Sequence, residues 1–262
     1  FLKVAHESFK LSDRRHLTPQ GSLGKVILLV VRALFETGVI PRKWNTAVVT
    51  AIYKGTGEKR DCGNYRGISV TSSILNLTSK IVAARLSSAL ERVNALPISQ
   101  AGFRKLEECP THSIALYECL KRRSNLGELT YVMFLDIKKA YDTVCHEGIM
   151  RALENIGVTD ELLEYIRGLY RDAKLCARSQ HGMSAIFDLL RGLRQGCPLS
   201  CIIFLVFFAD VLKPSENNQL GAIIPGLPVH DNRVPGMTFA DDLALLAGSL
   251  ADLKASFEVT VR

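Results

Sequence analysis

The residues of greatest chemical interest are the aspartates of two segments, FLDIKKAYD at residues 134–142 and FADD at residues 239–242. Each segment places a carboxylate at the end of an apolar run that is typical of a β-strand. A bare carboxylate there is unfavourable unless a cation or another positive group compensates its charge. Carboxylate oxygens suit Mg²⁺, and metal pairs about 3.5–4 Å apart recur in enzymes that make or break phosphodiester bonds. We therefore expect Asp136 and Asp241 to converge on a divalent-metal site.

The Asp241–Asp242 pair needs a choice between its two members. Adjacent side chains on a strand point to opposite faces, so only one of them can face a shared site. We assign Asp241 as the direct ligand and Asp242 as the weaker contributor. The alternative is an ordinary hairpin turn with solvated acids, which would be the better interpretation of FADD if the first segment were absent.

Composition limits the class of protein and of partner. The 262 residues are 47% hydrophobic and 23% charged, which indicates a globular chain rather than a disordered one. The formal charge of +7 favours a polyanionic partner. The seven cysteines are odd in number and lack a Cys-x-x-Cys pair, which is typical of a reduced compartment. No apolar run reaches the roughly 20 residues that span a bilayer, so we expect no membrane contact.

Hydrophobic periodicity predicts an α+β fold, with helices packed on a small antiparallel sheet. A charged, glycine-rich loop is expected over residues 54–67, and a hinge over residues 90–97. Helices are predicted over residues 23–35, 72–92, 111–123, 144–156, 161–169, 198–212 and 250–261. Strands are predicted over residues 46–53 and 129–135, as paired strands within 174–190, and as a hairpin of 234–239 and 243–247 with the acids at its tip.

The two acidic segments and a third one, RQGCPLS at residues 194–200, occur in an order that resembles the three palm motifs of reverse transcriptases. The resemblance is to the LINE-type (non-long-terminal-repeat, non-LTR) retrotransposon group. NYRGIS at residues 64–69 and QAGFR at residues 100–104 also resemble that group, so the similarity covers about residues 38–255. It implies the fingers and palm of a right-hand polymerase, with the small antiparallel sheet in the palm and no thumb.

The same resemblance implies a domain plan. Residues 1–37 would form an N-terminal helical extension, and residues 38–128 a fingers-like subdomain. Residues 129–262 would form the palm, with part of the fingers interleaved. The chain ends at Arg262 before the family's later palm motifs and thumb, so we expect this fragment to polymerise poorly by itself.

The resemblance assigns the acids to metal binding. Asp136, Asp241 and Asp242 would be the catalytic residues and would hold two Mg²⁺ ions, with Mn²⁺ as a substitute. The backbone carbonyl of Ile137 would be a further metal ligand.

Further residues would bind the incoming deoxynucleoside triphosphate. Tyr141 would be the steric gate that leaves no room for a 2′-hydroxyl, and the amides near Ala140 and Tyr141 would hold the triphosphate. Gln195 and Gly196 would lie beside the nucleotide and the template base. Alternatively, Gly196 only begins the buried helix that follows.

Basic residues would contact the charged substrates. Lys54 and Arg66 would clamp the triphosphate oxygens, because Arg and Lys neutralise the charge that a transferring phosphoryl group gains. Arg104 would approach the template backbone. Related sequences often continue QAGFR with Lys-Gly-Arg-Ser, whereas Glu107 and Glu108 follow here, and this departure weighs against the template contact.

The implied function is an RNA-directed DNA polymerase with an RNA template, a DNA primer and dNTP as partners. One alternative is a group-II-intron-type reverse transcriptase, and another is a non-catalytic RNA-binding remnant of a degraded element. We expect an intracellular protein that acts in the nucleus of its host, because such an element copies itself into chromosomes.

Overall fold

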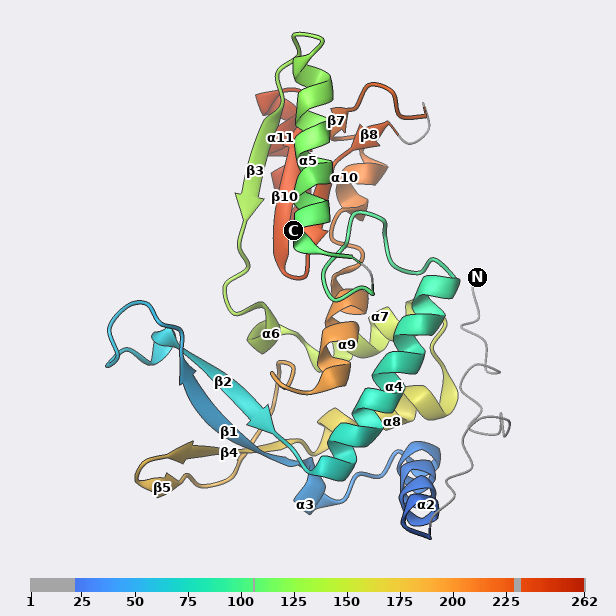
Figure 1. Ribbon diagram of the computed structural model, residues 1–262, viewed down its shortest axis with the longest axis vertical. Helices are drawn as coiled ribbons and strands as arrows, with labels where there is room; N and C mark the ends of the chain where they lie inside the picture. The colour runs from blue at the N-terminus through green and yellow to red at the C-terminus, as the bar shows by residue number, and fades with distance from the viewer. Residues whose placement is uncertain (1–21, 106, 229–231, 262) are drawn as a thin grey trace. The chain divides into compact units, whose positions relative to one another are not determined.

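The computed structural model describes residues 22–105, 107–228 and 232–261 (Figure 1). Its contacts divide the chain into two compact units. Unit 1 contains the described residues up to Ala95 together with Tyr141–Phe204, and unit 2 contains Leu96–Ala140 and the described residues from Leu205 onward. The division after Ala95 falls inside the predicted hinge at 90–97. The predicted subdomains 1–37, 38–128 and 129–262 are functional divisions that the contact units do not test, so they stay a prediction.

Unit 1 contains a sheet whose main strand order is β2-β1-β4-β5. Its first strand, β1 (Thr46–Tyr53), is rich in β-branched residues, and it pairs antiparallel with β2 (Tyr65–Val70). The other edge of β1 pairs parallel with β4 (Lys174–Ser179). Two short strands, β5 (Gly182–Met183) and β6 (Phe187–Asp188), pair antiparallel with β4.

Two features of this sheet differ from the sequence-based expectation. The predicted loop over residues 54–67 ends earlier, because β2 already begins at Tyr65, where Tyr65 pairs with Tyr53. The parallel β1–β4 pair was not predicted at all. It joins residues that lie more than a hundred positions apart, so no local pattern could reveal it.

Helices cover the remainder of unit 1. The longest, α4 (Ser73–Arg92), begins where the Ser72 hydroxyl accepts a hydrogen bond from the Leu75 amide at 3.2 Å, as expected of an N-cap serine. Its Leu86 and the Ile166 of α8 are both fully buried, and the Ser79 hydroxyl of α4 lies 3.4 Å from the Tyr165 hydroxyl of α8. The helical segments of the unit are α2 (Ser22–Thr37), α3 (Arg42–Asn45), η1 (Cys62–Asn64), α4, α6 (Ala140–Thr143, at the boundary), α7 (His146–Asn155) and α8 (Asp160–Arg171).

A close approach within unit 1 makes Gly168 of α8 a sensitive position. A Cβ added at Gly168 would lie 1.9 Å from the Gly38 carbonyl oxygen, at the end of α2. We expect Gly168→Ala to destabilise the protein by about 3 kcal/mol, since overpacking against a fixed backbone forces the two helices apart. Urea unfolding measures this difference, and a variant as stable as the natural protein would contradict the close contact.

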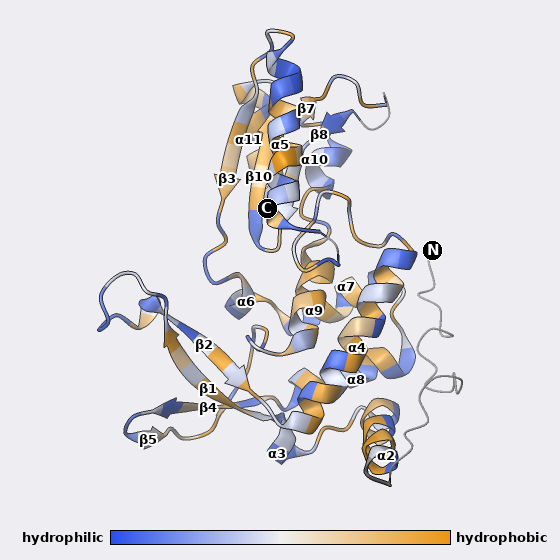
Figure 2. Cartoon of the chain, viewed as in Figure 1, coloured by the Kyte–Doolittle hydropathy of each residue, from blue (hydrophilic) through white to orange (hydrophobic). Residues whose placement is uncertain are grey.

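Unit 2 is organised around a three-stranded antiparallel sheet of order β3-β10-β9, the small sheet that the sequence predicted. The strands are β3 (Tyr131–Leu135), β9 (Gly236–Phe239) and β10 (Asp242–Ala247). Most of β10 is buried, and Figure 2 shows it almost wholly in the apolar colour. A separate pair, β7 (Ala222–Ile223) with β8 (Arg233–Val234), adds a short ribbon.

Side-chain alternation gives the sheet of unit 2 two packed faces. Ala244 and Leu246 of β10 pack on one face against α5 (Cys109–Ser124) and the β7–β8 ribbon. Leu243 and Leu245 pack on the other face with Leu253 of α11 (Leu250–Thr260). The sheet therefore has packing partners on both faces.

The most apolar helix is α9 (Pro198–Phe208), and the division between the two units falls inside it. It ends four residues before the predicted 212, and α10 (Lys213–Asn217) follows with Pro214 in its first turn. The combined stretch Pro198–Asn217 is long and apolar enough to cross a membrane, but most of it is buried inside the protein. A buried core helix passes the same test, so this finding gives little support for a membrane span. The seven cysteines all lie in described residues and are free thiols.

Candidate active site

The predicted hairpin with acids at its tip is confirmed. Phe239 of β9 pairs with Asp242 of β10, which leaves Ala240 and Asp241 as a two-residue turn. Asp136 directly follows Leu135, the last residue of β3. Since β3 and β9 flank β10 in one sheet, the three acids lie at the same end of that sheet.

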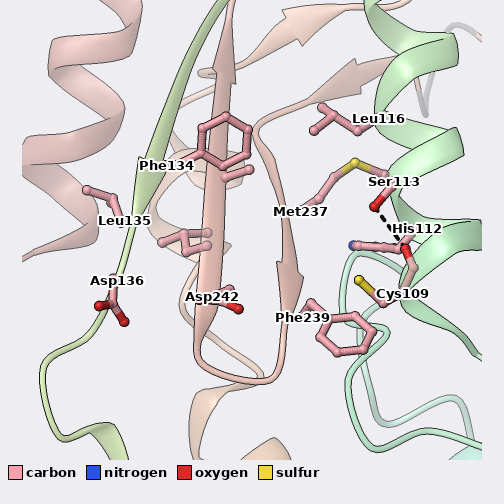
Figure 3. A pocket seen from close by; sticks show the side chains of 12 residues that line it. Cys109, His112, Ser113, Leu116, Phe134, Leu135, Asp136, Met237, Phe239 and Asp242 are labelled. Carbon is pink, nitrogen blue, oxygen red and sulfur yellow. Dashed lines mark hydrogen bonds between the residues drawn. The ribbon is translucent and has the colours of Figure 1, made fainter. Parts of the chain in front are cut away.

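The strand register decides which acid lies across from Asp136. Leu243 pairs with Leu135 in the antiparallel β10–β3 ladder, so the next position along places Asp242 opposite Asp136. Residues directly opposite one another share a face of the sheet. Figure 3 shows both carboxylates at one end of the same pocket.

The reason given for ranking Asp241 above Asp242 was wrong, because Asp241 lies in the turn rather than on a strand. Strand alternation therefore says nothing about its direction. The pocket beside Asp136 is lined by Asp242. The ranking of the two acids as metal ligands stays a prediction.

The three acids lie close enough to affect one another's charge. The pKa of Asp242 is raised, first by burial and then by the negative charges of Asp241 and Asp136. A divalent cation would relieve this repulsion, and carboxylate oxygens are the donors that Mg²⁺ prefers. Among the described residues, no three His, Cys, Asp or Glu side chains are already gathered closely enough to hold an ion. The three carboxylates are thus ligands of the type that Mg²⁺ prefers, but in this structure they are not already arranged closely enough to hold an ion.

Asp242→Asn is expected to raise the thermal unfolding midpoint at pH 7 in the absence of divalent cations. Because the folded-state pKa of Asp242 is raised, its carboxylate form costs free energy in the folded protein as the pH rises through that pKa. Below the ordinary value of 3.8 the carboxyl is protonated in both states, so the variant and the natural protein should then differ little. Melting curves at pH 3 and pH 7 measure the effect, and an equal difference at both would contradict it.

A largely apolar pocket of about 350 Å³ adjoins the acids on the α5 face of the sheet (Figure 3). Phe134, Met237 and Phe239 line it from the sheet, and Cys109 and His112 line it from α5. The His112 ring lies 6.4 Å from that of Phe239, and burial lowers the pKa of His112. The neutral imidazole is therefore favoured, and the pocket supplies an apolar wall beside the carboxylates.

The turn formed by Ala240 and Asp241 has an unfavourable backbone conformation and is supported by another segment. Ala240 has φ of +57°, a conformation that glycine usually provides at the first position of such turns. For a residue with a Cβ this costs about 1–3 kcal/mol, so the conformation persists only where neighbouring groups enforce it. The neighbour is Gln100, whose side-chain amide bonds to both the amide and the carbonyl of Ala240. No local sequence pattern indicates this role of Gln100, because the turn that it contacts lies 140 residues further along the chain.

Other predicted residues of unit 2 make local contacts. The Arg104 guanidinium donates to the carbonyls of Pro97 and Gln100 at 3.0 and 2.9 Å, so it fixes the QAGFR segment itself. The Ala140 amide donates to the Ile137 carbonyl at 3.1 Å. In this conformation that amide is therefore engaged within the chain, and the Ile137 carbonyl retains one lone pair for another partner.

Unit 1 gathers the predicted nucleotide residues around RQGCPLS. The half-buried Tyr141 ring stacks on Phe204 with centroids 4.7 Å apart, and the Tyr141 carbonyl accepts the Leu193 amide at 2.8 Å. The Gln195 carbonyl accepts the amide of Ser69 in β2 at 2.7 Å. Gly196 has φ of +108°, and a Cβ there would lie 2.9 Å from the Ser69 oxygen. Glycine is thus required by the backbone conformation and by the close approach of β2, and the role of Gly196 beside the nucleotide stays a prediction.

A buried arginine that the sequence analysis did not single out anchors this loop. Arg194 is only 4% exposed, and its Nη2 donates to the backbone oxygen and to Oδ1 of Asn45, at 2.7 and 2.8 Å. Burial lowers the pKa of Arg194. Because both contacts reach the residue just before β1, Arg194 ties the loop that carries Gln195 to the sheet of unit 1.

The two predicted basic residues lie on the β1–β2 hairpin of unit 1 and are exposed. Lys54 directly follows β1, and its Nζ donates to the Gly63 carbonyl at 2.9 Å. Arg66 lies on β2, opposite Ile52. The predicted site residues are divided between the two units. Unit 1 contains Lys54, Arg66, Tyr141, Gln195 and Gly196, and unit 2 contains Arg104, Asp136, Ile137, Ala140, Asp241 and Asp242.

Comparison with known proteins gives consistent results. The family model described as "Reverse transcriptase (RNA-dependent DNA polymerase)" matches residues 57–262. The Pol polyprotein of the type-1 retrotransposable element R2 from Popillia japonica is 30% identical over 80% of this chain and 28% of its own length. The RNA-directed DNA polymerase from the mobile element jockey of Drosophila funebris is 24% identical over 88% of this chain and 24% of its own length. The chain thus spans about a quarter of these curated relatives.

Solved structures share the fold at low identity. Apo telomerase from Candida tropicalis, truncated of its C-terminal domain, aligns with a TM-score of 0.57 at 13% identity. The alignment covers 85% of this chain and 47% of that protein. At this identity the likeness concerns the fold alone.

Proposed function

Because this chain belongs to the reverse transcriptase (RNA-dependent DNA polymerase) family, we propose that it copies an RNA template into DNA for a non-LTR retroelement. It would extend the 3′-hydroxyl of a DNA primer with deoxynucleotides. The observation that carries this proposal is the meeting of Asp136, Asp241 and Asp242 at one end of the unit 2 sheet. Its site of action would be the nucleus of the host, where chromosomal DNA is found.

The acids are proposed to bind two divalent ions, Mg²⁺ with Mn²⁺ as substitute. The family is generally dependent on divalent metal. Asp136 and Asp241 would hold the ions, with help from Asp242 and the Ile137 carbonyl. When bound, the metals would supply positive charge where the transferred phosphoryl group gains negative charge.

The chain's own side chains would bind and select the nucleotide. Lys54 and Arg66 are exposed, and neither forms an ion pair with a carboxylate of the described residues. They therefore suit the role of neutralising triphosphate oxygens. The Tyr141 ring stacks on Phe204, and in the proposed role it would exclude a 2′-hydroxyl. An Ala140 amide contact to the triphosphate would require its bond to Ile137 to open.

Primer extension tests the proposed function. The full-length natural protein is incubated with an RNA template, an annealed DNA primer, Mg²⁺ and dNTP. We expect templated addition of deoxynucleotides that stops when EDTA removes the metal. Binding of the RNA without any extension, under conditions where a known reverse transcriptase is active, would contradict the proposal and favour the non-catalytic remnant.

The choice of sugar tests Tyr141. We expect Tyr141→Ala to reduce the preference for dNTP over rNTP at least about tenfold, because the ring that excludes the 2′-hydroxyl is lost. Tyr141→Phe keeps the ring and serves as the matched control. The ratio of kcat/KM values for the two nucleotides measures the preference, and an unchanged ratio in Tyr141→Ala would remove the gate from the proposal.

A further inference from the structure

Gln100 is a buried polar side chain that contacts the turn before Asp241. It is only 1% exposed. Its Oε1 accepts hydrogen bonds from the amides of Ala240 and Gly102, both at 2.9 Å, and its Nε2 donates to the Ala240 carbonyl at 3.1 Å. One side-chain amide therefore satisfies both backbone polar groups of Ala240, as a neighbouring strand would.

The backbone around Gln100 is fixed independently of these contacts. Gln100 forms a parallel bridge with Thr238 of β9. The Ala101 amide donates to the Thr238 carbonyl at 3.0 Å, and the Thr238 amide donates to the Ser99 carbonyl at 2.8 Å. Residues 99–101 thus lie along β9 like a short added strand. The backbone of Gln100, from which its side chain extends, is therefore held in place.

The turn needs such support because of its conformation. Ala240 has φ of +57°, which its Cβ disfavours. The carbonyl of Ala240 belongs to the peptide plane that leads into Asp241. A hydrogen bond that fixes this carbonyl also fixes the plane that contains the amide nitrogen and Cα of Asp241, the atoms from which its side chain departs.

We propose that Gln100 is a positioning residue, which holds the Ala240 turn so that Asp241 stays directed toward the metal-binding end of the sheet. This inference rests on the proposed function of the three acids. A side-chain amide is required, because it provides an acceptor and a donor in one planar group. Methionine would fill a similar volume but leave both groups of Ala240 unbonded, and glutamate would lose the donor.

The experiment compares Gln100→Met with Thr238→Val in the full-length natural protein. Thr238 is 2% exposed, and its hydroxyl donates to the Ser99 carbonyl at 3.3 Å, so its loss also removes a buried hydrogen bond from the same bridge. Primer extension gives kcat, the KM for dNTP and the Mg²⁺ concentration at half-maximal rate. Electron paramagnetic resonance gives the affinity for Mn²⁺. Asp136→Asn is the reference variant, and the Mn²⁺ that it still binds is assigned to other sites on the protein.

We expect Gln100→Met to lower kcat at least about tenfold and to raise the half-maximal Mg²⁺ concentration at least about threefold, with a similar loss of Mn²⁺ affinity. Thr238→Val should keep the natural metal dependence. If Gln100→Met does not fold, Gln100→Glu takes its place, because glutamate has the same shape and keeps the acceptor. If the variant that folds keeps the natural metal dependence, the inference is overturned. This also holds when its activity is lower only because a smaller fraction of the protein is folded.

Failure of the proposed function gives a different result. A natural protein that does not extend primers would contradict the polymerase proposal. The Mn²⁺ titration still tests the role of Gln100 in that case, because the titration requires metal binding and no polymerisation. Weaker Mn²⁺ binding in the variant supports the positioning role. Equal Mn²⁺ binding contradicts the positioning role.

Discussion

Asp136→Asn is expected to lower the rate of RNA-templated DNA synthesis by at least about 10³-fold. The substitution keeps the size of the side chain but removes the charge that lies across the sheet from Asp242. Asparagine binds divalent cations more weakly than a carboxylate, so the charge that stabilises the transferring phosphoryl group would be lost. RNA affinity should change little, because phosphate contacts depend on basic side chains.

Single-turnover primer extension and a filter-binding assay measure the two quantities separately. Asp172→Asn is the matched control, since it removes one exposed carboxylate from unit 1 and leaves the acidic cluster intact. Synthesis by Asp136→Asn within tenfold of the natural rate would contradict the assignment of Asp136. A parallel loss of RNA binding would indicate misfolding, which a melting curve would show directly.

Gly102→Ala is expected to lower synthesis by about 10²-fold. A Cβ at Gly102 would lie 2.1 Å from the Ala240 amide nitrogen and 2.7 Å from its Cα. These are backbone atoms of a short turn, so the turn itself must move. Displacement of a catalytic group by about 1 Å can cost 10²-fold in rate, and Asp241 is the next residue in the chain.

Gly248→Ala is the matched control for that variant. Gly248 follows the other end of β10, and the nearest atom to its added Cβ is Nη2 of Arg123 at 3.3 Å. We expect this control to keep most of the activity. Natural rates in Gly102→Ala would show that the turn can shift without moving the catalytic group. They would contradict a functional role for the close contact between Gly102 and Ala240.

The hairpin and the helices could be predicted because each depends on neighbours in sequence. Alternating apolar residues end at FADD and predict two strands with acids between them, and this hairpin is confirmed. Helical spacing after Ser72 predicts α4, whose start the Ser72 hydroxyl caps. The family was equally accessible, since FLDIKKAYD, RQGCPLS and FADD are short motifs whose order survives in the linear chain.

The supports of the site could not be predicted in this way. The parallel β1–β4 pair and the contacts of Gln100 with Ala240 and of Arg194 with Asn45 all join residues that lie far apart in sequence. The relative placement of Asp241 and Asp242 depended on where the strand ends and the turn begins. Element boundaries are set by hydrogen bonds to partner strands, which periodicity does not record.

The linear order of residues thus determined which chemical groups this protein has and which short elements carry them, because carboxylate chemistry and periodicity are local properties. Tertiary structure alone decided that Asp242 lies across from Asp136, and that a glutamine and a glycine from another segment hold the turn of Asp241. The physical reason is that strand register and buried hydrogen bonds are satisfied between distant segments, so their partners exist only once the chain has folded.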